Sequence, residues 1–395
     1  MRRLLNRMAT LPTLICAVLL SLACGAAPDW DATNEAAKLA HSEGRLDEAR
    51  EGFEEALEIA AGMEANDSRR VISLNNLGQF LRSQDRLDLA VPMFQRAAEL
   101  READPDVDRV ELSADFGNLA GHLQRLGRLD EAMSYYERAL AIQQDPDDGD
   151  PTQMGTTLNN MGMLAYMSNR LDAADDFYTR GMASMEASLL LDHPDVATVS
   201  NNLGQLRMAQ GQIEEAEQYF ERAIRIWSTN LGPDSDTVAR CRGSRGEALR
   251  RLKRFDEAEE EHTRALRIFE AQSGADHPDV ASSLNSIAVL ARVTGRPEEA
   301  ENNYRRAIEI LEKATPNGSP DLGAARFNLA RLLQERGKSS DAMILFEQAM
   351  ITLESTLGPE HPNLIIVYTT YADMLVDAGQ NERAATLRQR AESLR

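Results

Sequence analysis

Gly127–Ala132 reads Gly-Arg-Leu-Asp-Glu-Ala, and a close copy returns as Gly-Gln-Ile-Glu-Glu-Ala at Gly211–Ala216 and as Gly-Arg-Pro-Glu-Glu-Ala at Gly295–Ala300. The residue that opens this motif recurs every 42 residues along the chain, after a first interval of 41. A fixed period of this size is typical of a solenoid, in which each unit buries its apolar face against its neighbours. The residues that mark the period are Gly44, Asp85, Gly127, Asn169, Gly211, Lys253, Gly295, Gly337 and Gly379.

The composition agrees with a long helical array. Of the 395 residues, 43% are hydrophobic and only 5% are aromatic, which suits packing built on Ala, Leu and Gly. No stretch alternates apolar and polar residues as a β-strand would, so we predict an all-α fold. The formal net charge of −21 argues against nucleic acid as a partner, because a polyanion repels it. We expect the surplus acids to lie on a solvated outer face that keeps the protein soluble.

Residues 1–23 have the layout of a secretory signal, with early arginines, a short apolar stretch and a small residue before the expected cleavage site. The apolar part is too short for a transmembrane helix. The segment resembles a bacterial lipoprotein signal, in which cleavage precedes a cysteine that becomes lipidated, here Cys24. Ser21 departs from the aliphatic residue usual there, so secretion as a soluble protein is the alternative. The resemblance implies export to the bacterial outer membrane or periplasm, a short linker at 24–30, and membrane contact only through the lipid.

The fifth repeat shows how one unit is built. Asp195–Leu206 is predicted to be a first helix, and a second helix runs from Ile213 to about Trp227. A small residue, Gly204, stands where the first helix must come close to the second, and Phe220 supplies a large wedge between the two. Small-to-large changes at such sites overpack a helix pair by roughly 1–3 kcal/mol.

These offsets resemble the tetratricopeptide repeat, and the 42-residue period with its His-Pro-Asp-Val-Ala and Glu-Glu-Ala-Glu motifs is similar to the variant found in kinesin light chains. The resemblance covers residues 31–395 and implies a right-handed superhelical solenoid of about nine antiparallel helix pairs, closed by a polar capping repeat. The sixth repeat departs most, because Cys241, Gly243 and Arg245 replace the expected Leu, Asn and Leu. We expect a bend or a softer joint there, with Cys241 as a small apolar filler.

The resemblance also implies that first helices line a concave groove, where asparagine recurs at one position. Asparagine is a poor residue for a helix interior, so its recurrence calls for a reason. Its amide both donates and accepts, which suits gripping an extended peptide backbone. The alternative is that these amides bridge neighbouring helices within the solenoid. With the asparagines that precede them, the candidates are Asn76, Asn118, Asn159, Asn160, Asn201, Asn202, Asn285 and Asn328.

A second candidate row follows about one helical turn later. Its arginines make the inner face of repeats six to eight look basic within an acidic chain, which predicts attraction of an acidic segment or a C-terminal carboxylate. The alternative is that these arginines pair with acids of neighbouring repeats, an interaction that contributes little. Tyr166 belongs instead to an adaptable apolar stretch. The row consists of Arg82, Tyr166, Arg250, Arg292 and the nearby Arg331.

Motifs for chemistry are missing from the sequence. It contains no glycine-rich phosphate loop, no His-Glu-x-x-His, no paired cysteines and no nucleophile elbow. We therefore expect no enzymatic activity, no cofactor and no metal site. The prediction is a protein–protein interaction scaffold or adaptor at the bacterial cell envelope that binds extended peptide segments in its concave groove. The alternative is a structural, self-associating component of an envelope assembly that uses its convex face or its ends.

Overall fold

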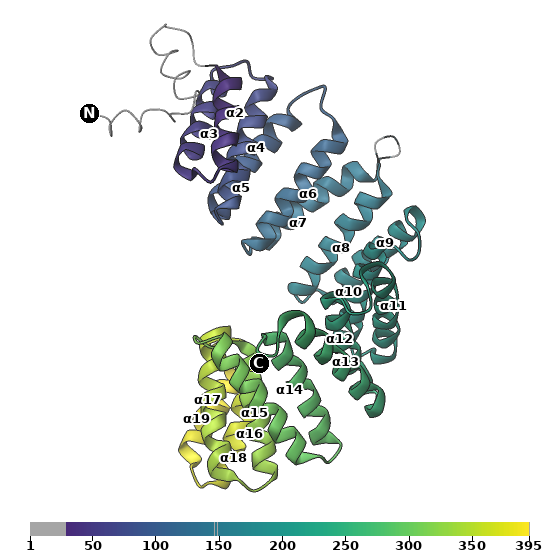
Figure 1. Ribbon diagram of the computed structural model, residues 1–395, viewed down its shortest axis with the longest axis vertical. Helices are drawn as coiled ribbons and strands as arrows, with labels where there is room; N and C mark the ends of the chain where they lie inside the picture. Colours follow the sequence, from purple (N-terminus) through teal and green to yellow (C-terminus); the bar gives the residue numbers. More distant parts are fainter. Residues whose placement is uncertain (1–28, 146, 148, 395) are drawn as a thin grey trace, which may run out of the picture. The chain divides into compact units, whose positions relative to one another are not determined.

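The computed structural model describes residues 29–145, 147 and 149–394, and every element within these residues is an α-helix (Figure 1). Consecutive helices pair, which confirms the expected all-α repeat fold. The first helices of the pairs are α2 (Trp30–Ser42), α4 (Ser68–Ser83), α6 (Arg109–Arg125), α8 (Pro151–Met167), α10 (Pro194–Gln210), α12 (Asp236–Arg251), α14 (Pro278–Val293), α16 (Pro320–Glu335) and α18 (Leu364–Asp377). The second helices are α3 (Leu46–Ala61), α5 (Leu87–Glu102), α7 (Leu129–Gln143), α9 (Leu171–Ser188), α11 (Ile213–Leu231), α13 (Phe255–Ser273), α15 (Pro297–Ala314), α17 (Ser339–Leu357) and α19 (Asn381–Ser393).

The helices belong to two compact units, which we call unit 1 (Met1–Ser188, with α2 to α9) and unit 2 (Leu189–Arg395, with α10 to α19). Within each unit, every helix packs most extensively on the other helix of its pair and then on the adjoining pair. In unit 2, first helices of successive pairs also touch one another, as α12 does with α10 and α14. We call the surface formed by the first helices of a unit its first-helix face.

All the residues that mark the sequence period adopt a left-handed backbone conformation where a first helix ends. Six of them are glycines, for example Gly211 with a φ of 78°. The exceptions are Asp85, Asn169 and Lys253, with φ values of 57°, 55° and 61°. The backbone N–H of the following residue then donates into the last helical turn, as Gln212 does to the carbonyl oxygen of Arg207 at 2.8 Å. This Schellman arrangement ends the helix sharply and explains why the period is clearest at this residue.

In four of the pairs, the close approach of the two helices depends on a glycine that faces a ring, whereas alanine stands at the same repeat position in others, as Ala288 and Ala330 do. A Cβ atom on Gly204 would lie 2.6 Å from Cε1 of Phe220, and one on Gly162 would lie 2.6 Å from Cδ1 of Tyr178. Such distances are far inside van der Waals contact, so only glycine allows this spacing. The predicted roles of Gly204 and Phe220 are confirmed.

On the second helices, a fully buried alanine allows the same close approach. In every pair one alanine of the second helix has no exposed surface, so the first helix can approach its backbone closely. Aromatic residues fill the space around it, and Tyr304 and Phe346 are also completely buried. The buried alanines are Ala49, Ala90, Ala132, Ala174, Ala216, Ala258, Ala300, Ala342 and Ala384.

The sixth repeat, formed by α12 and α13, replaces part of this apolar packing with charge. Arg245 Nη2 lies 2.5 Å from Oε1 of Glu217 on α11, and its Nη1 lies 3.0 Å from Oε1 of Glu261 on α13. Arg242 Nη1 lies 2.7 Å from the other oxygen of Glu261. We call these four side chains the charged joint. They are only 9% to 16% exposed, so the ion pairs lie largely out of solvent.

Cys241 is buried beside the charged joint, with its Sγ 3.6 Å from the carbonyl oxygen of Phe220. Burial raises the pKa of the Cys241 thiol to about 12, so it stays protonated at neutral pH. The predicted filler role is confirmed. The expectation of leucine at this position is wrong, because other repeats carry residues such as Thr157 and Ser283 there. The leucine of other repeats is one residue later, where the sixth repeat has Arg242. The softer joint expected in this repeat stays a prediction.

Candidate binding pocket on the first-helix face

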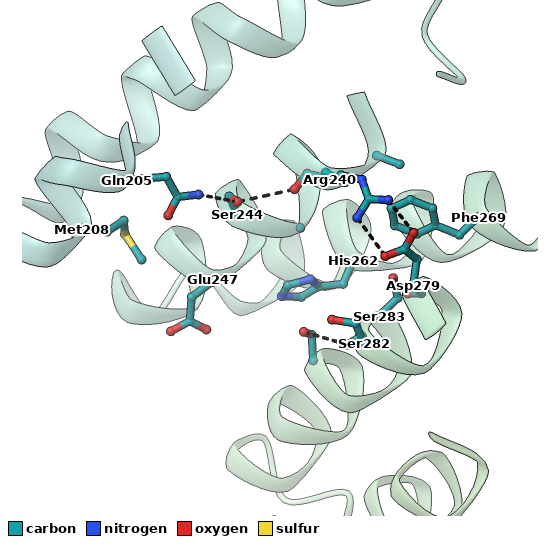
Figure 2. Close-up of a pocket in the computed structure, with 13 residues that line it drawn as sticks. Gln205, Met208, Arg240, Ser244, Glu247, His262, Phe269, Asp279, Ser282 and Ser283 are labelled. Carbon is teal, nitrogen blue, oxygen red and sulfur yellow. Dashed lines mark hydrogen bonds and ion pairs between the residues drawn. The ribbon is translucent and has the colours of Figure 1, made fainter. Parts of the chain in front are cut away.

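A pocket of about 430 Å³ opens on the first-helix face of unit 2, among residues of α10, α12 and α14 (Figure 2). The second helix α13 contributes His262 and Phe269. Ser244 and Ser286 line the pocket at the repeat position that carries the predicted asparagines elsewhere. The remaining lining residues are Gln205, Met208, Ala239, Arg240, Gly243, Glu247, Asp279, Ser282 and Ser283.

Gly243 helps to keep this pocket open. The same repeat position carries Asn75, Asn159, Asn201 and Asn285 in other repeats. A Cβ atom on Gly243 would meet no atom within 4 Å, so packing does not require a glycine there. A glycine inside a helix is about 1 kcal/mol less favourable than alanine. The missing side chain therefore creates open space without a structural benefit to the helix pair.

His262 replaces the aromatic wedge of the other repeats and faces the pocket (Figure 2). A Cβ atom on Gly246 would lie 2.7 Å from Cε1 of its ring, so this pair approaches as closely as the others. The His262 side chain is 2% exposed, and its Nε2 has no hydrogen-bond partner among the described residues. Burial lowers the pKa of His262 to about 4 against the opposing charge of Glu247, so the imidazole is neutral at pH 7.

Several hydrogen-bond donors around the pocket are already engaged. Gln205 Nε2 donates to Ser244 Oγ at 2.9 Å (Figure 2). The hydroxyls of Ser283 and Ser286 donate to backbone carbonyl oxygens of their own helix, at 3.0 and 3.1 Å. A hydroxyl group whose hydrogen is engaged in a hydrogen bond still has two oxygen lone pairs that can accept. These serines therefore offer chiefly acceptors to a ligand.

The charged groups at the pocket are paired with one another. Arg240 makes a two-pronged ion pair with Asp279, at 2.9 and 2.7 Å. Glu247 accepts two hydrogen bonds from Arg250, both at 2.7 Å, and one from Arg251 at 3.1 Å. Burial acts to raise the pKa of Glu247, but hydrogen bonding and charge from these arginines lower it overall, so Glu247 is ionised at neutral pH.

Unit 1 contains a counterpart at equivalent positions four repeats earlier, between α4 and α6. This space, which we call the notch, has a volume of about 190 Å³. Asn75 stands there in place of Gly243, and Phe94 stands in place of His262. The other lining residues are Gln79, Arg82, Asp115, Asn118, Leu119 and His122.

Several of the predicted asparagines bridge neighbouring repeats. Asn76 Nδ2 on α4 donates to Asn34 Oδ1 on α2 at 2.8 Å, and Asn328 Nδ2 on α16 donates to Asn285 Oδ1 on α14 at 3.1 Å. These bonds agree with the alternative in which the amides connect helices of the solenoid. Each amide retains further donor or acceptor capacity, so a role in peptide binding stays a prediction.

The other predicted asparagines differ in exposure. Asn160 on α8 forms a hydrogen bond with the hydroxyl of Tyr136 on α7, whereas Asn159 is buried. Asn118 is exposed and lines the notch, so its amide is accessible to a ligand. The remaining two, Asn201 and Asn202, are half-buried on α10.

The predicted arginines are mostly engaged with the protein itself. Arg250 pairs with Glu247, and Arg292 Nη1 lies 2.7 Å from Oε1 of Glu335 on the next first helix. The guanidinium carbon of Arg331 lies 5.9 Å from the centroid of an aromatic ring of its own helix. The ion pairs of Arg250 and Arg292 agree with the alternative of internal pairing and reduce the positive charge expected on the inner face of repeats six to eight. Of the other members of the row, Arg82 is exposed and lines the notch, and Tyr166 is half-buried on α8.

Reasoning from the sequence missed the residues that distinguish the pocket, which are Gly243, Glu247 and His262. The signal that could have identified His262 is a histidine at a repeat position that elsewhere carries phenylalanine or tyrosine; Gly243 is a weaker signal, because the same position carries asparagine in four repeats but glycine again at Gly117. As an irregularity of the sixth repeat, Gly243 predicts a bend or a softer joint, whereas the structure places it at the wall of the pocket.

The predicted signal segment 1–23 and the lipidation candidate Cys24 lie outside the described residues. Helix α2 begins at Trp30, inside the predicted linker. None of the helices in the described ranges is both long and apolar enough to cross a membrane. Within those same ranges, no group of three or more His, Cys, Asp or Glu side chains is placed to hold a metal ion.

Comparison with known proteins agrees with the repeat architecture. The family model of the tetratricopeptide repeat matches residues 31–103, 111–187, 195–271, 242–313 and 321–395. A search of curated proteins found no match to this chain.

Three solved structures illustrate what the fold is similar to. The apo form of the quorum sensor NprR from B. thuringiensis is 12% identical, covers 92% of this chain and 98% of its own, and has a TM-score of 0.63. The apo form of RapI is 13% identical, covers 71% and 97%, and has a TM-score of 0.58. Putative kinesin light chain repeats from Podosopora anserina are 20% identical, cover 52% and 96%, and have a TM-score of 0.45. These likenesses concern the fold alone, whereas the family model matches most of the sequence, and the chain belongs to the tetratricopeptide repeat family.

Proposed function

We propose that this protein is a non-enzymatic scaffold or adaptor that binds extended segments of partner proteins on its first-helix faces. The observation that carries this proposal is the pocket of unit 2, which opens on that face and is kept open by Gly243, where packing requires no glycine. Tetratricopeptide repeats are typical of protein–protein interaction and are generally non-catalytic. A solenoid suits this role because it offers a long surface whose side chains vary while the packing positions stay constant.

We further propose that the protein acts at the bacterial cell envelope. The support is the amino-acid sequence of residues 1–23 followed by Cys24, which has the layout of an exported lipoprotein. A lipid on Cys24 would hold the repeats at a membrane surface. Metabolic labelling with a fatty-acid analogue tests this, because label should enter the wild type and be absent from Cys24→Ser.

A second candidate function is docking or self-association through second helices. Ile344 and Ile351 on α17 lie two helical turns apart and are 58% and 57% exposed. Exposed apolar side chains on one stripe of a helix favour contact with another protein. This surface is separate from the first-helix face, so variants can distinguish the two functions.

The test compares two double variants in cross-linked capture from the native envelope fraction. The first, Gly117→Phe with Gly243→Phe, places a bulky side chain on the first-helix face of each unit. Both positions have open space within 4 Å of a Cβ atom, and Phe327 occupies the same repeat position naturally. The second, Ile344→Ser with Ile351→Ser, alters α17 alone. Circular dichroism should show equal helicity for both variants.

We expect the phenylalanine variant to lose partners that the serine variant retains, and the purified partner to bind it at least tenfold more weakly than the wild type. Retention of every partner by the phenylalanine variant, with loss in the serine variant, would overturn the proposal and establish docking through α17.

A further inference from the structure

We propose that the pocket among α10, α12 and α14 binds the guanidinium group of an arginine carried by the bound segment. The inference rests on the proposed function, because it names the side chain that the first-helix face of unit 2 selects. It also reverses the charge expected from the sequence, which favoured an acidic partner.

The first step of the argument is the supply of acceptors. The hydroxyl groups of Ser283 and Ser286 donate hydrogen bonds to backbone carbonyl oxygens, so their oxygen lone pairs are left to accept. Glu247 contributes an ionised carboxylate. A ligand for this pocket must therefore be rich in donors, and a guanidinium presents five N–H groups in one plane.

The second step is charge. Carboxylates of Glu247 and Asp279 both line the pocket; arginines already hold each of them, but Oε2 of Glu247 and both oxygens of Asp279 keep lone pairs that can accept further hydrogen bonds from a cationic donor. The imidazole of His262 is neutral at pH 7 and does not repel one. Arg240 also borders the pocket, but it is held by both oxygens of Asp279 and lies over the ring of Phe269, with its guanidinium carbon 5.6 Å from the centroid. The formal net charge of −21 draws basic segments toward the protein.

The third step is the contrast with the notch of unit 1. There Arg82 lines the space, so a second guanidinium would be repelled. At the equivalent position of unit 2, Arg250 is bound to Glu247 through two hydrogen bonds and does not line the pocket. Gly243 adds the room that Asn75 occupies in the notch. The two sites therefore differ both in charge and in volume, and only the pocket suits a long cationic side chain.

The experiment follows the ring of His262 by NMR in the full chain labelled at histidine Cε1. The protein contains six histidines, and His262→Phe assigns the signal; other repeats carry Phe94 or Phe220 at this position, so the fold tolerates the change. The probes are capped five-residue alanine peptides whose central residue is arginine, lysine, citrulline or glutamate. Citrulline has the shape of arginine without its charge.

We expect the arginine peptide to shift the His262 signal saturably and to bind at least tenfold more tightly than the citrulline peptide and several-fold more tightly than the lysine peptide. The glutamate peptide should leave the signal in place. Equal affinity for arginine and citrulline, equal affinity for arginine and lysine, or no shift with arginine would each overturn the proposal.

Matched variants locate the effect. Gly243→Asn restores the common residue of the repeats and fills the pocket, so it should weaken the arginine peptide at least tenfold. Gly117→Asn makes the same change at the same repeat position in unit 1 and should leave its affinity unchanged. If partners are still lost from the phenylalanine variant described above while the arginine peptide fails to bind, the scaffold function stands and only the arginine pocket is overturned.

Discussion

The notch between α4 and α6 and the pocket among α10, α12 and α14 use equivalent repeat positions, yet their volumes are about 190 and 430 Å³. The packing glycine is the same in both, Gly78 in one and Gly246 in the other. What differs are residues that the packing leaves free, above all Asn75 against Gly243 and Phe94 against His262. The solenoid therefore holds its helix pairs at constant spacing while it varies the surface beside them.

The two units also differ at neighbouring positions of the first helices α4 and α12. Unit 1 has Leu74 and Leu77 where unit 2 has Arg242 and Arg245. The leucines belong to ordinary apolar packing, whereas the arginines need Glu217 and Glu261 as partners. Paired charges out of solvent are tolerated only while every partner is present.

Removing one partner from the charged joint should give the largest effect. Glu261→Met, which copies Met93 of unit 1, leaves Arg242 and Arg245 short of a carboxylate and should destabilise the sixth repeat by about 3 kcal/mol. Amide hydrogen exchange in α12 measures the loss. Adding Arg242→Leu and Arg245→Leu should recover most of it. A change below about 1 kcal/mol in the single variant would show that the joint behaves like exposed ion pairs.

The second-largest expected effect is a loss of stability on acidification that occurs in unit 2 and has no counterpart at Phe94 of unit 1. Because the folded pKa of His262 is about 4 and the unfolded value is near 6.5, the unfolded chain binds the proton first as pH falls. Stability of the sixth repeat should therefore decrease from about pH 6.5 down to pH 4, by roughly 3 kcal/mol in total. Unfolding at a series of pH values, followed in α13, measures it. His262→Phe should remove this component, and an unchanged pH profile in that variant would contradict the assignment.

A third test concerns the packing glycines that the two sites share. A Cβ atom on Gly78 would lie 2.8 Å from the ring of Phe94, so Gly78→Ala should overpack the pair and destabilise unit 1 by roughly 1–3 kcal/mol. Urea denaturation monitored in unit 1 provides the measurement. The companion change Gly246→Ala places its Cβ atom 2.7 Å from the His262 ring and should destabilise unit 2 by a similar amount. If either variant is as stable as the wild type, the two helix pairs do not share the same close spacing.

The smallest expected effect has the opposite sign. Gly243→Ala places its Cβ in open space inside α12 and should stabilise that helix by about 0.5–1 kcal/mol. A higher urea midpoint with an unchanged m-value would confirm the gain. Destabilisation would mean that Gly243 serves packing after all, and the argument that it keeps the pocket open would fail.

Much of the fold could be predicted from the sequence because its signals are local. Gly211 and its equivalents mark left-handed helix ends, and Gly204 with Phe220 sets the spacing of a pair; each of these roles depends on neighbours within one repeat. The candidate site was predicted less well. Ser244 and Ser286, at the repeat position of the predicted asparagines, line the pocket, but their role in binding stays a prediction, and the arginines beside them are paired, as Arg250 is with Glu247.

By itself the sequence determined the period, the α-helical pairs, the turns between them and the family. Only the tertiary structure decided which side chains face one another across repeats: Arg292 with Glu335, Asn76 with Asn34, and His262 with the space left by Gly243. The reason is physical. Helix formation and helix ending follow from residues within a turn or two of each other, whereas ion pairing and cavity shape depend on side chains from several helices that meet only when neighbouring repeats pack.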